Sequence, residues 1–273
     1  MPLAVCATPI GNLEDVTLRT LRELAEADLV LCEDTRRTRI LLDRHGVTAR
    51  LLSFHRHNEA QRTAELLPRL EGGERIALAS DAGLPGVNDP GARLLASALE
   101  RGVQVTVLPG PSAVETALVA SGLVGERYTF LGYLPRTRAG RETLWQELGG
   151  WDWPAVAFES PRRLPASLAA LAEVEPDRAV AVCRELTKRF EEVVRGSARE
   201  LAERFREAPK GEVTVVIGPA SGRAAAEGEG VPEAEAAHAV VELVAAGLPR
   251  RSAVGIVARL TGLPRNALYR RSL

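Results

Sequence analysis

The sequence of 273 residues contains only three cysteines, Cys6, Cys32 and Cys183. Their odd number and wide spacing argue against a disulfide framework and a paired-cysteine metal site. Such sparse thiols are typical of a reducing compartment, so we expect a cytoplasmic protein. No metal is expected either, because His55 and His57 have no third ligand nearby at zinc-like spacing.

Aromatic residues and long apolar runs are also scarce. Aromatics make up 4% of the chain, which disfavours the base-stacking platforms of general single-strand-binding proteins. No stretch reaches the roughly 18 apolar residues that suggest a transmembrane helix. The first residues lack a basic region and a long apolar run, so no signal peptide is expected. The net charge of −1 gives no overall preference for nucleic acid or for a membrane surface.

Short apolar runs alternate with helical patterns in the first part of the chain, which predicts a mostly parallel sheet with helices on both faces. The expected strands there are 3–7, 29–32, 75–79 and 103–108, and the expected helices are 17–27, 36–44, 60–70, 91–101 and 113–120. A second αβ unit is expected to have mixed strand directions. Its expected strands are 128–131, 155–158, 179–183 and 213–217, and its expected helices are 163–172 and 198–207.

Composition suggests where the domains end. A glycine-containing turn at 122–125 separates an N-terminal α/β domain, 1–121, from a second α/β domain, 122–219. Residues 220–232 are rich in Ala, Gly, Ser and Glu, which is typical of a linker. The remainder, 233–273, has helical patterning. The expected fold class is α/β, with two α/β domains and a small C-terminal module resembling a helix-turn-helix.

The most informative segment is the loop 80–91, which follows the apolar run 76–79 and precedes a helical pattern. Three glycines and two prolines in this loop allow tight turns and a close approach of backbone to a ligand. A strand, a small-residue loop and a helix form ligand sites at the carboxyl edge of α/β sheets. The alternative is an ordinary strand-to-helix turn. The loop matches neither common phosphate-binding pattern.

Four more polar or glycine-containing loops follow predicted strands. They are 7–13, 32–37, 108–113 and 158–163. Ser112 and Ser160 lie where they could cap the helices that follow. Several such loops converge on one cleft in an open α/β sheet.

Together these segments carry a family resemblance. The relevant sequences, in chain order, are TPIGNLEDVTLR, EDTRRTRILL, SDAGLPGVNDPG, LPGPSA, FESPRR and RELTK. The set resembles the tetrapyrrole methylase superfamily of S-adenosylmethionine-dependent enzymes, and within it the branch that acts on ribosomal RNA. The resemblance implies a homodimer whose subunits each hold S-adenosylmethionine in a cleft between two α/β domains. It also implies 2′-O-methylation of a cytidine ribose in the decoding region of 16S ribosomal RNA, with the small ribosomal subunit as partner.

The resemblance also assigns residues. Those expected to bind the cofactor are Pro9, Gly11, Asp81, Gly83, Leu84, Ser112, Ala113, Phe158, Leu186 and Val213. The segments 33–36 and 55–59 match the ribosomal RNA branch, so substrate contacts are expected from Glu33, Arg36, His55 and Asn58.

Transfer of an activated methyl group needs mainly alignment in a dry pocket. A ribose hydroxyl is a weak acid, so a base or a nearby cation would assist. The catalytic candidates are therefore Asp34, Glu59, Glu185 and Lys188. A lysine would act as a base if burial lowered its pKa, or would stabilise the developing alkoxide as a cation.

Simpler interpretations stay open for several of these residues. Asp81 could bond only to neighbouring turn amides, and Asp34 could form a surface ion pair with Arg36. The acidic pairs at 191–192 and within 200–204 are expected on solvated helix faces.

The tail differs from the rest in charge. Between 248 and 273 there are six arginines and no acidic residue. A helix over 252–260, a turn and a second helix from Pro264 to about Arg271 would form the module, with Ala258 and Gly262 at the crossing. Arg250, Arg251 and Arg265 are expected to contact RNA phosphates. The alternative is a helical dimerisation or capping module.

Three functions remain to be separated. The first is ribosomal RNA methylation. The second is methylation of a corrin precursor or of a modified histidine, as in diphthine synthesis, by the same superfamily; a basic tail argues against it. The third is a regulator that senses a small molecule and binds DNA, which leaves the charged segments 33–37 and 55–59 unexplained.

Overall fold

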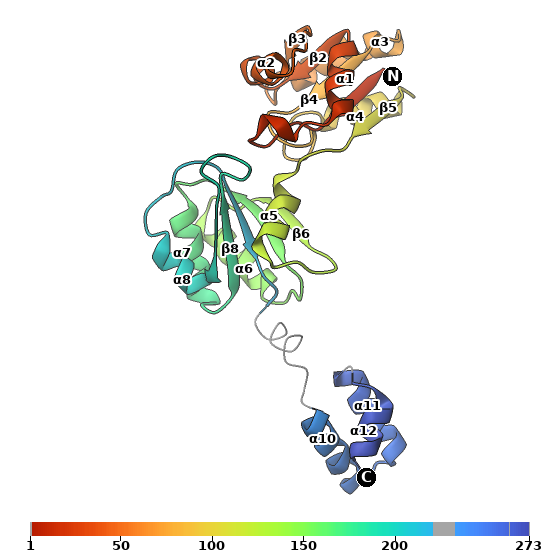
Figure 1. The fold of residues 1–273 in the computed structure, drawn as a ribbon, viewed down its shortest axis with the longest axis vertical. Helices are drawn as coiled ribbons and strands as arrows, with labels where there is room; N and C mark the ends of the chain where they lie inside the picture. Colours follow the sequence, from red (N-terminus) through yellow and green to blue (C-terminus); the bar gives the residue numbers. More distant parts are fainter. Residues whose placement is uncertain (1, 221–232, 262, 273) are drawn as a thin grey trace. The chain divides into compact units, whose positions relative to one another are not determined.

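The computed structural model describes residues 2–220, 233–261 and 263–272. Its contacts divide the chain into two compact units (Figure 1). The first comprises Met1–Gln146 and Trp153–Gly218, and the second comprises Glu147–Asp152 and Pro219–Leu273. Nearly all of the predicted linker, 221–232, lies outside the described residues.

The first sheet is parallel throughout, which confirms the prediction for this part of the chain. Its five strands lie in the order β3-β2-β4-β1-β5. They are β1 (Leu3–Cys6), β2 (Leu29–Cys32), β3 (Leu51–Ser53), β4 (Ile76–Ala79) and β5 (Val105–Leu108). The short edge strand β3 was not predicted from the sequence.

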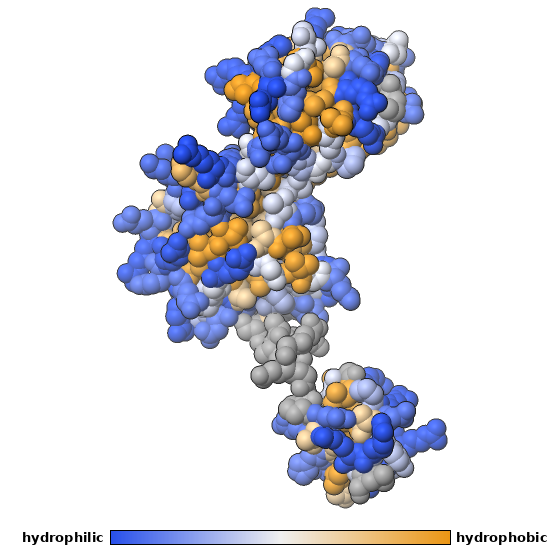
Figure 2. Space-filling model, in the orientation of Figure 1, coloured by the Kyte–Doolittle hydropathy of each residue, from blue (hydrophilic) through white to orange (hydrophobic). Residues whose placement is uncertain are grey.

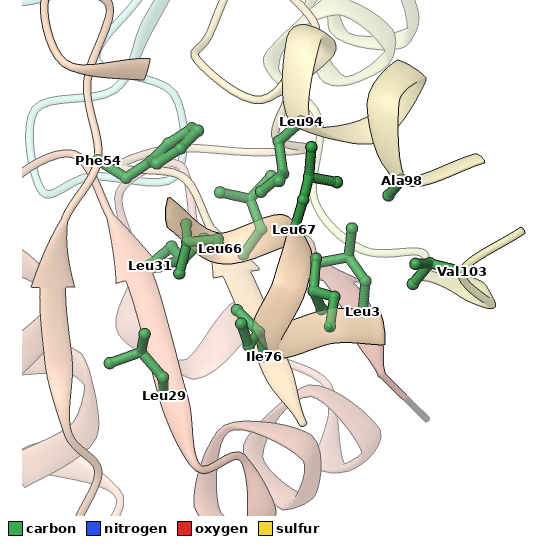
Figure 3. Close-up of a cluster of buried hydrophobic side chains, with 12 residues drawn as sticks. Leu3, Leu29, Leu31, Phe54, Leu66, Leu67, Ile76, Leu94, Ala98 and Val103 are labelled. Atoms are coloured by element: carbon green, nitrogen blue, oxygen red, sulfur yellow. The ribbon is translucent and has the colours of Figure 1, made fainter. Parts of the chain in front are cut away.

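Helices cover both faces of this sheet, because successive strand residues point to opposite sides. On one face, α3 (Glu59–Glu71) and α4 (Ala92–Glu100) pack their leucines on Leu3, Leu31 and Ile76 (Figure 3). On the other face, α1 (Leu18–Glu26) and α2 (Thr35–Arg44) contribute Leu24 and Leu42. Each fully buried leucine contributes roughly 1.5–3 kcal/mol to stability. The two leucine cores hold the loops at the strand ends in place.

The second sheet is mixed, as expected. Its strands lie in the order β6-β7-β10-β8-β9, and only β6 and β7 are parallel neighbours. They are β6 (Thr129–Tyr133), β7 (Ala155–Glu159), β8 (Ala179–Arg184), β9 (Glu192–Ser197) and β10 (Val213–Ile217). Glu192 therefore begins an edge strand, and its expected place on a helix face was wrong. Its side chain pairs with Arg184 across β8 and β9.

Four helices accompany this sheet: α5 (Ala113–Ser121), α6 (Arg138–Leu148), α7 (Leu164–Val174) and α8 (Ala198–Arg204). The sequence did not predict α6. Val114, Ala117 and Leu118 of α5 are buried with residues of the second sheet. The core of this half therefore begins with α5, immediately after the turn that ends the first sheet.

The second unit contains the helices α10 (Glu233–Ala245), α11 (Arg250–Thr261) and α12 (Arg265–Arg271). They bury Val240, Val254 and Leu268 in a small core of their own. The expected helical module is confirmed, while Gly262, proposed for the helix crossing, lies outside the described residues.

In Figure 2 hydrophilic side chains cover most of the visible surface, and apolar ones gather in patches. None of the described helices is long and apolar enough to cross a membrane.

Candidate active site

A cavity of about 780 Å³ opens where loops of the two sheets meet. Its walls come from the loops after β1, β4 and β5 and from β6, β7, β8 and β10. The carboxyl ends of parallel strands are the usual ligand position in α/β folds. Most of the predicted cofactor residues line this first cavity: Gly83, Leu84, Ser112, Ala113, Phe158, Leu186 and Val213.

The loop after β4 owes its shape to glycine. Gly83, Gly86 and Gly91 have positive φ values of 85°, 85° and 132°, a region that side-chain-bearing residues rarely adopt. Gly83 also exchanges two backbone hydrogen bonds with Thr8, of 2.9 and 3.0 Å. This bridge places the loop after β4 beside the loop after β1, so both reach the cavity.

Four carboxylates line the first cavity, and no Arg, Lys or His is found among its described lining residues. They are Asp89, Glu115, Glu159 and Glu212. Such a wall favours a cationic ligand and disfavours an anionic one. Asp89 was not among the site residues predicted from the sequence, although it lies in the glycine-rich loop.

Asp89 is the carboxylate of this wall whose pKa is raised. Burial, together with the neighbouring carboxylates of Glu33 and Asp81, raises the pKa of Asp89 to about 6, and Arg56 offsets only part of this rise. A carboxylate that is costly to ionise in the free protein gains most from a cation placed beside it.

Two of the other carboxylates are fixed by the protein. Glu159 is fully buried and accepts hydrogen bonds of 2.6 Å from the Ser160 amide and the Ser167 hydroxyl. Its other neighbour is Arg163, with Nη2 at 2.6 Å from Oε1. The charge of Glu159 is therefore largely neutralised within the protein.

Glu115 is bound by the hydroxyls of Ser112 and Tyr128. Burial raises the pKa of Glu115, but these hydrogen bonds outweigh burial and hold it below its usual value. Ser112 occupies the N-cap position of α5 but makes no capping hydrogen bond, so that detail of the prediction was wrong. Ser160 is not a cap either, since the N-cap of α7 is Arg163.

Part of the lining of the first cavity is apolar. The rings of Phe130 and Phe158 meet edge to face at 5.0 Å, and Tyr133 meets Phe158 at 5.6 Å. Leu186 and Val213 also line the cavity. A flat heterocycle would fit against these rings and aliphatic groups.

A second cavity of about 240 Å³ adjoins the first. Ile10, Ala82 and Glu212 line both. The other predicted cofactor residues, Pro9, Gly11 and Asp81, line only this second cavity.

The carboxylate of Asp81 contacts its neighbouring loop. One oxygen accepts a hydrogen bond of 3.0 Å from the Asp34 amide, and the other lies 3.8 Å from Arg37 Nη1. Asp81 therefore ties the loops after β2 and β4 together beside the second cavity.

Lys188 is the cation of the second cavity that is held most firmly. Its Nζ lies 2.9 Å from Glu185 Oε1 and 2.8 Å from Glu212 Oε2. Burial lowers the pKa of Lys188, but the bonds to Glu212 and Glu185 outweigh burial and keep the pKa above its usual value. The lysine is thus a permanent cation here, and the Lys188 interaction lowers the pKa of Glu185.

The remaining acid–base candidates have structural partners. Asp34 accepts two hydrogen bonds from the Arg36 guanidinium, of 3.0 and 2.8 Å. These bonds, with one from the Arg36 amide, lower the pKa of Asp34 to about 2, which makes it a weak base. Glu59 Oε1 accepts from the Gly91 and Arg93 amides at the start of α4, at 2.9 and 3.2 Å.

The proposed substrate residues are separated in the structure. Asn58 Oδ1 accepts a hydrogen bond of 2.8 Å from the His55 amide, so this pair shapes its own loop. Exposed Glu33 lies close enough to Asp89 to raise its pKa. Arg250, Arg251 and Arg265 belong to the second unit, where Arg251 and Arg265 are exposed and Arg250 donates to the Ser272 carbonyl.

Two protein families match the chain. Residues 2–202 match Tetrapyrrole (Corrin/Porphyrin) Methylases. Residues 231–273 match the RsmI C-terminal HTH domain. The two matches correspond to the α/β part and the helical module.

Individual proteins are similar over nearly the whole chain. It is 44% identical to Ribosomal RNA small subunit methyltransferase I of Mesorhizobium japonicum, over 99% of this chain and 91% of that protein. It is 43% identical to the protein of the same name from Thermotoga maritima, over 79% of this chain and 97% of that protein. A solved uroporphyrin-III C-methyltransferase from Thermus thermophilus, complexed with S-adenyl homocysteine, shares the fold. The TM-score is 0.56 and the identity 18%, over 79% of this chain and 96% of that one.

Proposed function

This chain belongs to the tetrapyrrole methylases, and within them to the ribosomal RNA small subunit methyltransferase I proteins, and from this premise we propose that it methylates ribosomal RNA. The proposed donor is S-adenosylmethionine. The proposed acceptor is the ribose 2′-hydroxyl of a cytidine in the decoding region of 16S ribosomal RNA.

The observation that supports the donor most directly is the charge of the first cavity. S-adenosylmethionine carries a sulfonium, an ammonium and a carboxylate group, so its net charge is positive. The cavity has four carboxylates and no basic residue among its described lining residues. Glu159 and Glu212 are paired with Arg163 and Lys188, so Asp89 and Glu115 supply most of the negative charge that is left for a ligand. An anionic dinucleotide would be repelled by the same wall. Phe158, Leu186 and Val213 are the proposed contacts of the adenine ring.

When bound, the donor supplies a methyl group whose C–S bond breaks with the electron pair left on sulfur, while the ribose oxygen gains the methyl and loses its proton to solvent. The protein has to align that oxygen, exclude competing water and balance the changing charge. We assign the last task to Lys188, a cation that would stabilise the oxygen as its proton leaves. Asp34 and Glu185 are poorer bases because their pKa values are lowered.

The helical module is proposed to add affinity for RNA. Arg250, Arg251 and Arg265 would meet phosphates, which gives a contact without base specificity. The Thermotoga maritima relative is too short to hold both an α/β part and a module of the size seen here. The α/β part is therefore proposed to carry out the chemistry, while the proposed RNA contact of the module rests on its arginines.

A homodimer and the small ribosomal subunit are the proposed partners. Both rest on the resemblance to the ribosomal RNA branch of the family. Light scattering of the purified protein tests the dimer. Co-sedimentation with small subunits tests the second partner.

Incubation with S-adenosylmethionine tritiated in its methyl group tests the activity. Small ribosomal subunits, naked 16S ribosomal RNA and a tetrapyrrole extract are offered separately. We expect label in one RNA fragment, recovered as an alkali-resistant dinucleotide because a 2′-O-methyl group blocks cleavage of the adjacent phosphodiester. Label only in the tetrapyrrole fraction would refute the RNA substrate and keep the methyltransferase.

A further inference from the structure

The two cavities share a wall, which bears on where the acceptor binds. Ile10, Ala82 and Glu212 line both cavities, so a group in one lies next to a group in the other. Transfer of a methyl group needs donor and acceptor atoms within about 3–3.5 Å of each other. If the first cavity takes the donor, the second is the adjoining space for the acceptor.

The sizes of the cavities agree with this division. At about 780 Å³, the first falls within the roughly 300–1,000 Å³ typical of sites for whole cofactors and drug-sized ligands. The second, at about 240 Å³, lies below that range. It therefore suits one nucleoside-sized group, and not a polynucleotide or a macrocycle.

The charged side chains of the two cavities also fit the division into a donor site and an acceptor site. Only acidic side chains carry charge among the described lining residues of the first cavity, whereas the second combines the basic Arg37 and Lys188 with the acidic Asp81 and Glu212. The Arg37 side chain is 62% exposed and its closest carboxylate contact is 3.8 Å long. Its guanidinium therefore remains available to a phosphate at the edge of the cavity.

A large apolar side chain follows Lys188 closely in the sequence. Phe190 is 66% exposed, two residues after Lys188, and the Arg189 guanidinium lies 5.6 Å from its ring centre. An exposed aromatic ring next to cationic side chains is the usual platform for a base of single-stranded RNA.

We propose that the second cavity is the acceptor site, which takes one nucleoside of a single-stranded RNA segment while Phe190 stacks on a neighbouring base. Lys188 then faces the reacting hydroxyl, and Arg37 meets the phosphate beside it. This assignment rests on the proposed function. It places Pro9, Gly11 and Asp81, which the sequence predicted to bind the cofactor, in the acceptor site.

Filling the second cavity tests the assignment. Ile40 lines only the second cavity and is 59% exposed, so Ile40→Trp should fold normally. Val87 lines only the first cavity and is 50% exposed, so Val87→Trp is the matched control. Binding of S-adenosylhomocysteine by calorimetry and single-turnover methylation of an RNA fragment containing the target are measured for each. Leu13→Trp, from another wall of the second cavity, is a second probe.

We expect Ile40→Trp to lower methylation at least tenfold and to leave the Kd for S-adenosylhomocysteine within twofold. Val87→Trp should instead weaken S-adenosylhomocysteine. Phe190→Ala should weaken RNA binding about tenfold, as expected for loss of one stacked base, and Phe190→Tyr should restore it.

Other results would overturn the assignment. Wild-type methylation by both Ile40→Trp and Leu13→Trp would show that the second cavity is not the acceptor site, while the proposed function stands. Loss of S-adenosylhomocysteine binding in Ile40→Trp would place the cavity on the donor side. Failure of the wild type to methylate any RNA, with S-adenosylhomocysteine bound, would refute the proposed function itself.

Discussion

Gly11 lies directly against Lys188. A Cβ atom on Gly11 would come within 2.5 Å of Lys188 Cγ and within 2.9 Å of the Leu186 carbonyl oxygen. The neighbouring Asn12 amide donates a hydrogen bond of 3.0 Å to Thr187 Oγ1. The loop after β1 therefore touches the loop after β8, and this contact sets Leu186 in the first cavity and Lys188 in the second.

Gly11→Ala should disturb both cavities at once. The side chain of Lys188 can swing aside, but the Leu186 carbonyl belongs to the backbone, so the loop itself must move. Overpacking of this kind costs about 1–3 kcal/mol. We expect S-adenosylhomocysteine affinity to fall about tenfold and methylation to fall with it, measured by calorimetry and by label transfer.

Gly255→Ala is the control for that substitution, since a Cβ there meets only Arg265, at 3.9 Å. Gly255→Ala should leave the affinity for S-adenosylhomocysteine unchanged. Full affinity in Gly11→Ala would mean that the contact between the two loops does not shape the site.

Asp89→Asn should weaken the donor and stabilise the free protein. The substitution removes a negative charge from the first cavity, so the Kd for S-adenosylmethionine should rise about tenfold. It also removes a carboxylate that is costly to ionise in its partly buried site, so the free energy of unfolding at pH 7.5 should rise by on the order of 1 kcal/mol. Calorimetry and thermal unfolding measure the two effects, and a fall in both affinity and stability would contradict this role.

Donor binding should also depend on pH through Asp89. Its pKa is raised from 3.8 to about 6 in the folded chain, so the folded state holds the proton more tightly than the unfolded state. Its contribution to stability is therefore greatest below pH 3.8 and is lost as the pH rises through 6. The cationic donor prefers the ionised form, so affinity should increase between about pH 5 and 7 and then level off.

Titration of S-adenosylmethionine affinity against pH tests that expectation. In Asp89→Asn the increase should disappear. The same increase in the variant would assign it to another group.

Much of the first sheet could be predicted because its strands are short apolar runs between polar loops. β2 has the predicted limits, and so does β10 in the second sheet. The strand β9 was missed because it is a half-exposed edge strand with charged residues, which hides its period-two pattern. The helix α6 was missed because charged residues interrupt its pattern, although Trp145 is buried.

Within the site, the sequence predicted only the loops that glycine and proline mark. Glycine and proline mark loops by their own conformational limits, so several loops that line the first cavity were identified from the sequence. The perturbed pKa of Asp89 depends on burial and on Glu33 and Asp81, which the fold brings near. The division into two cavities depends on contacts such as that of Gly11 with Lys188, which spacing in the sequence does not show.

Lys188→Met should lower kcat and leave donor affinity nearly unchanged. Loss of a group that stabilises developing negative charge costs roughly 10²–10³ in rate. Lys188→Arg keeps the charge and should retain part of the activity. Lys210→Met is the control, because Lys210 is the other lysine of the chain and lines neither cavity. If Lys188→Met and Lys188→Arg lost donor affinity to the same extent, and thermal stability to the same extent, the role of Lys188 would be purely structural.

Arg250, Arg251 and Arg265 should act on RNA affinity alone. Replacing all three by Gln should weaken RNA binding and lower the slope of log Kd against log salt by up to about 3, one for each lost phosphate contact. Donor affinity should not change, because these arginines lie in a unit with its own core. Filter binding at several salt concentrations measures the slope. Exposed Arg19 and Arg22, on α1, provide a control pair. An unchanged slope in the triple variant, with RNA still bound, would assign the module to dimerisation or capping and leave phosphate binding to the α/β unit.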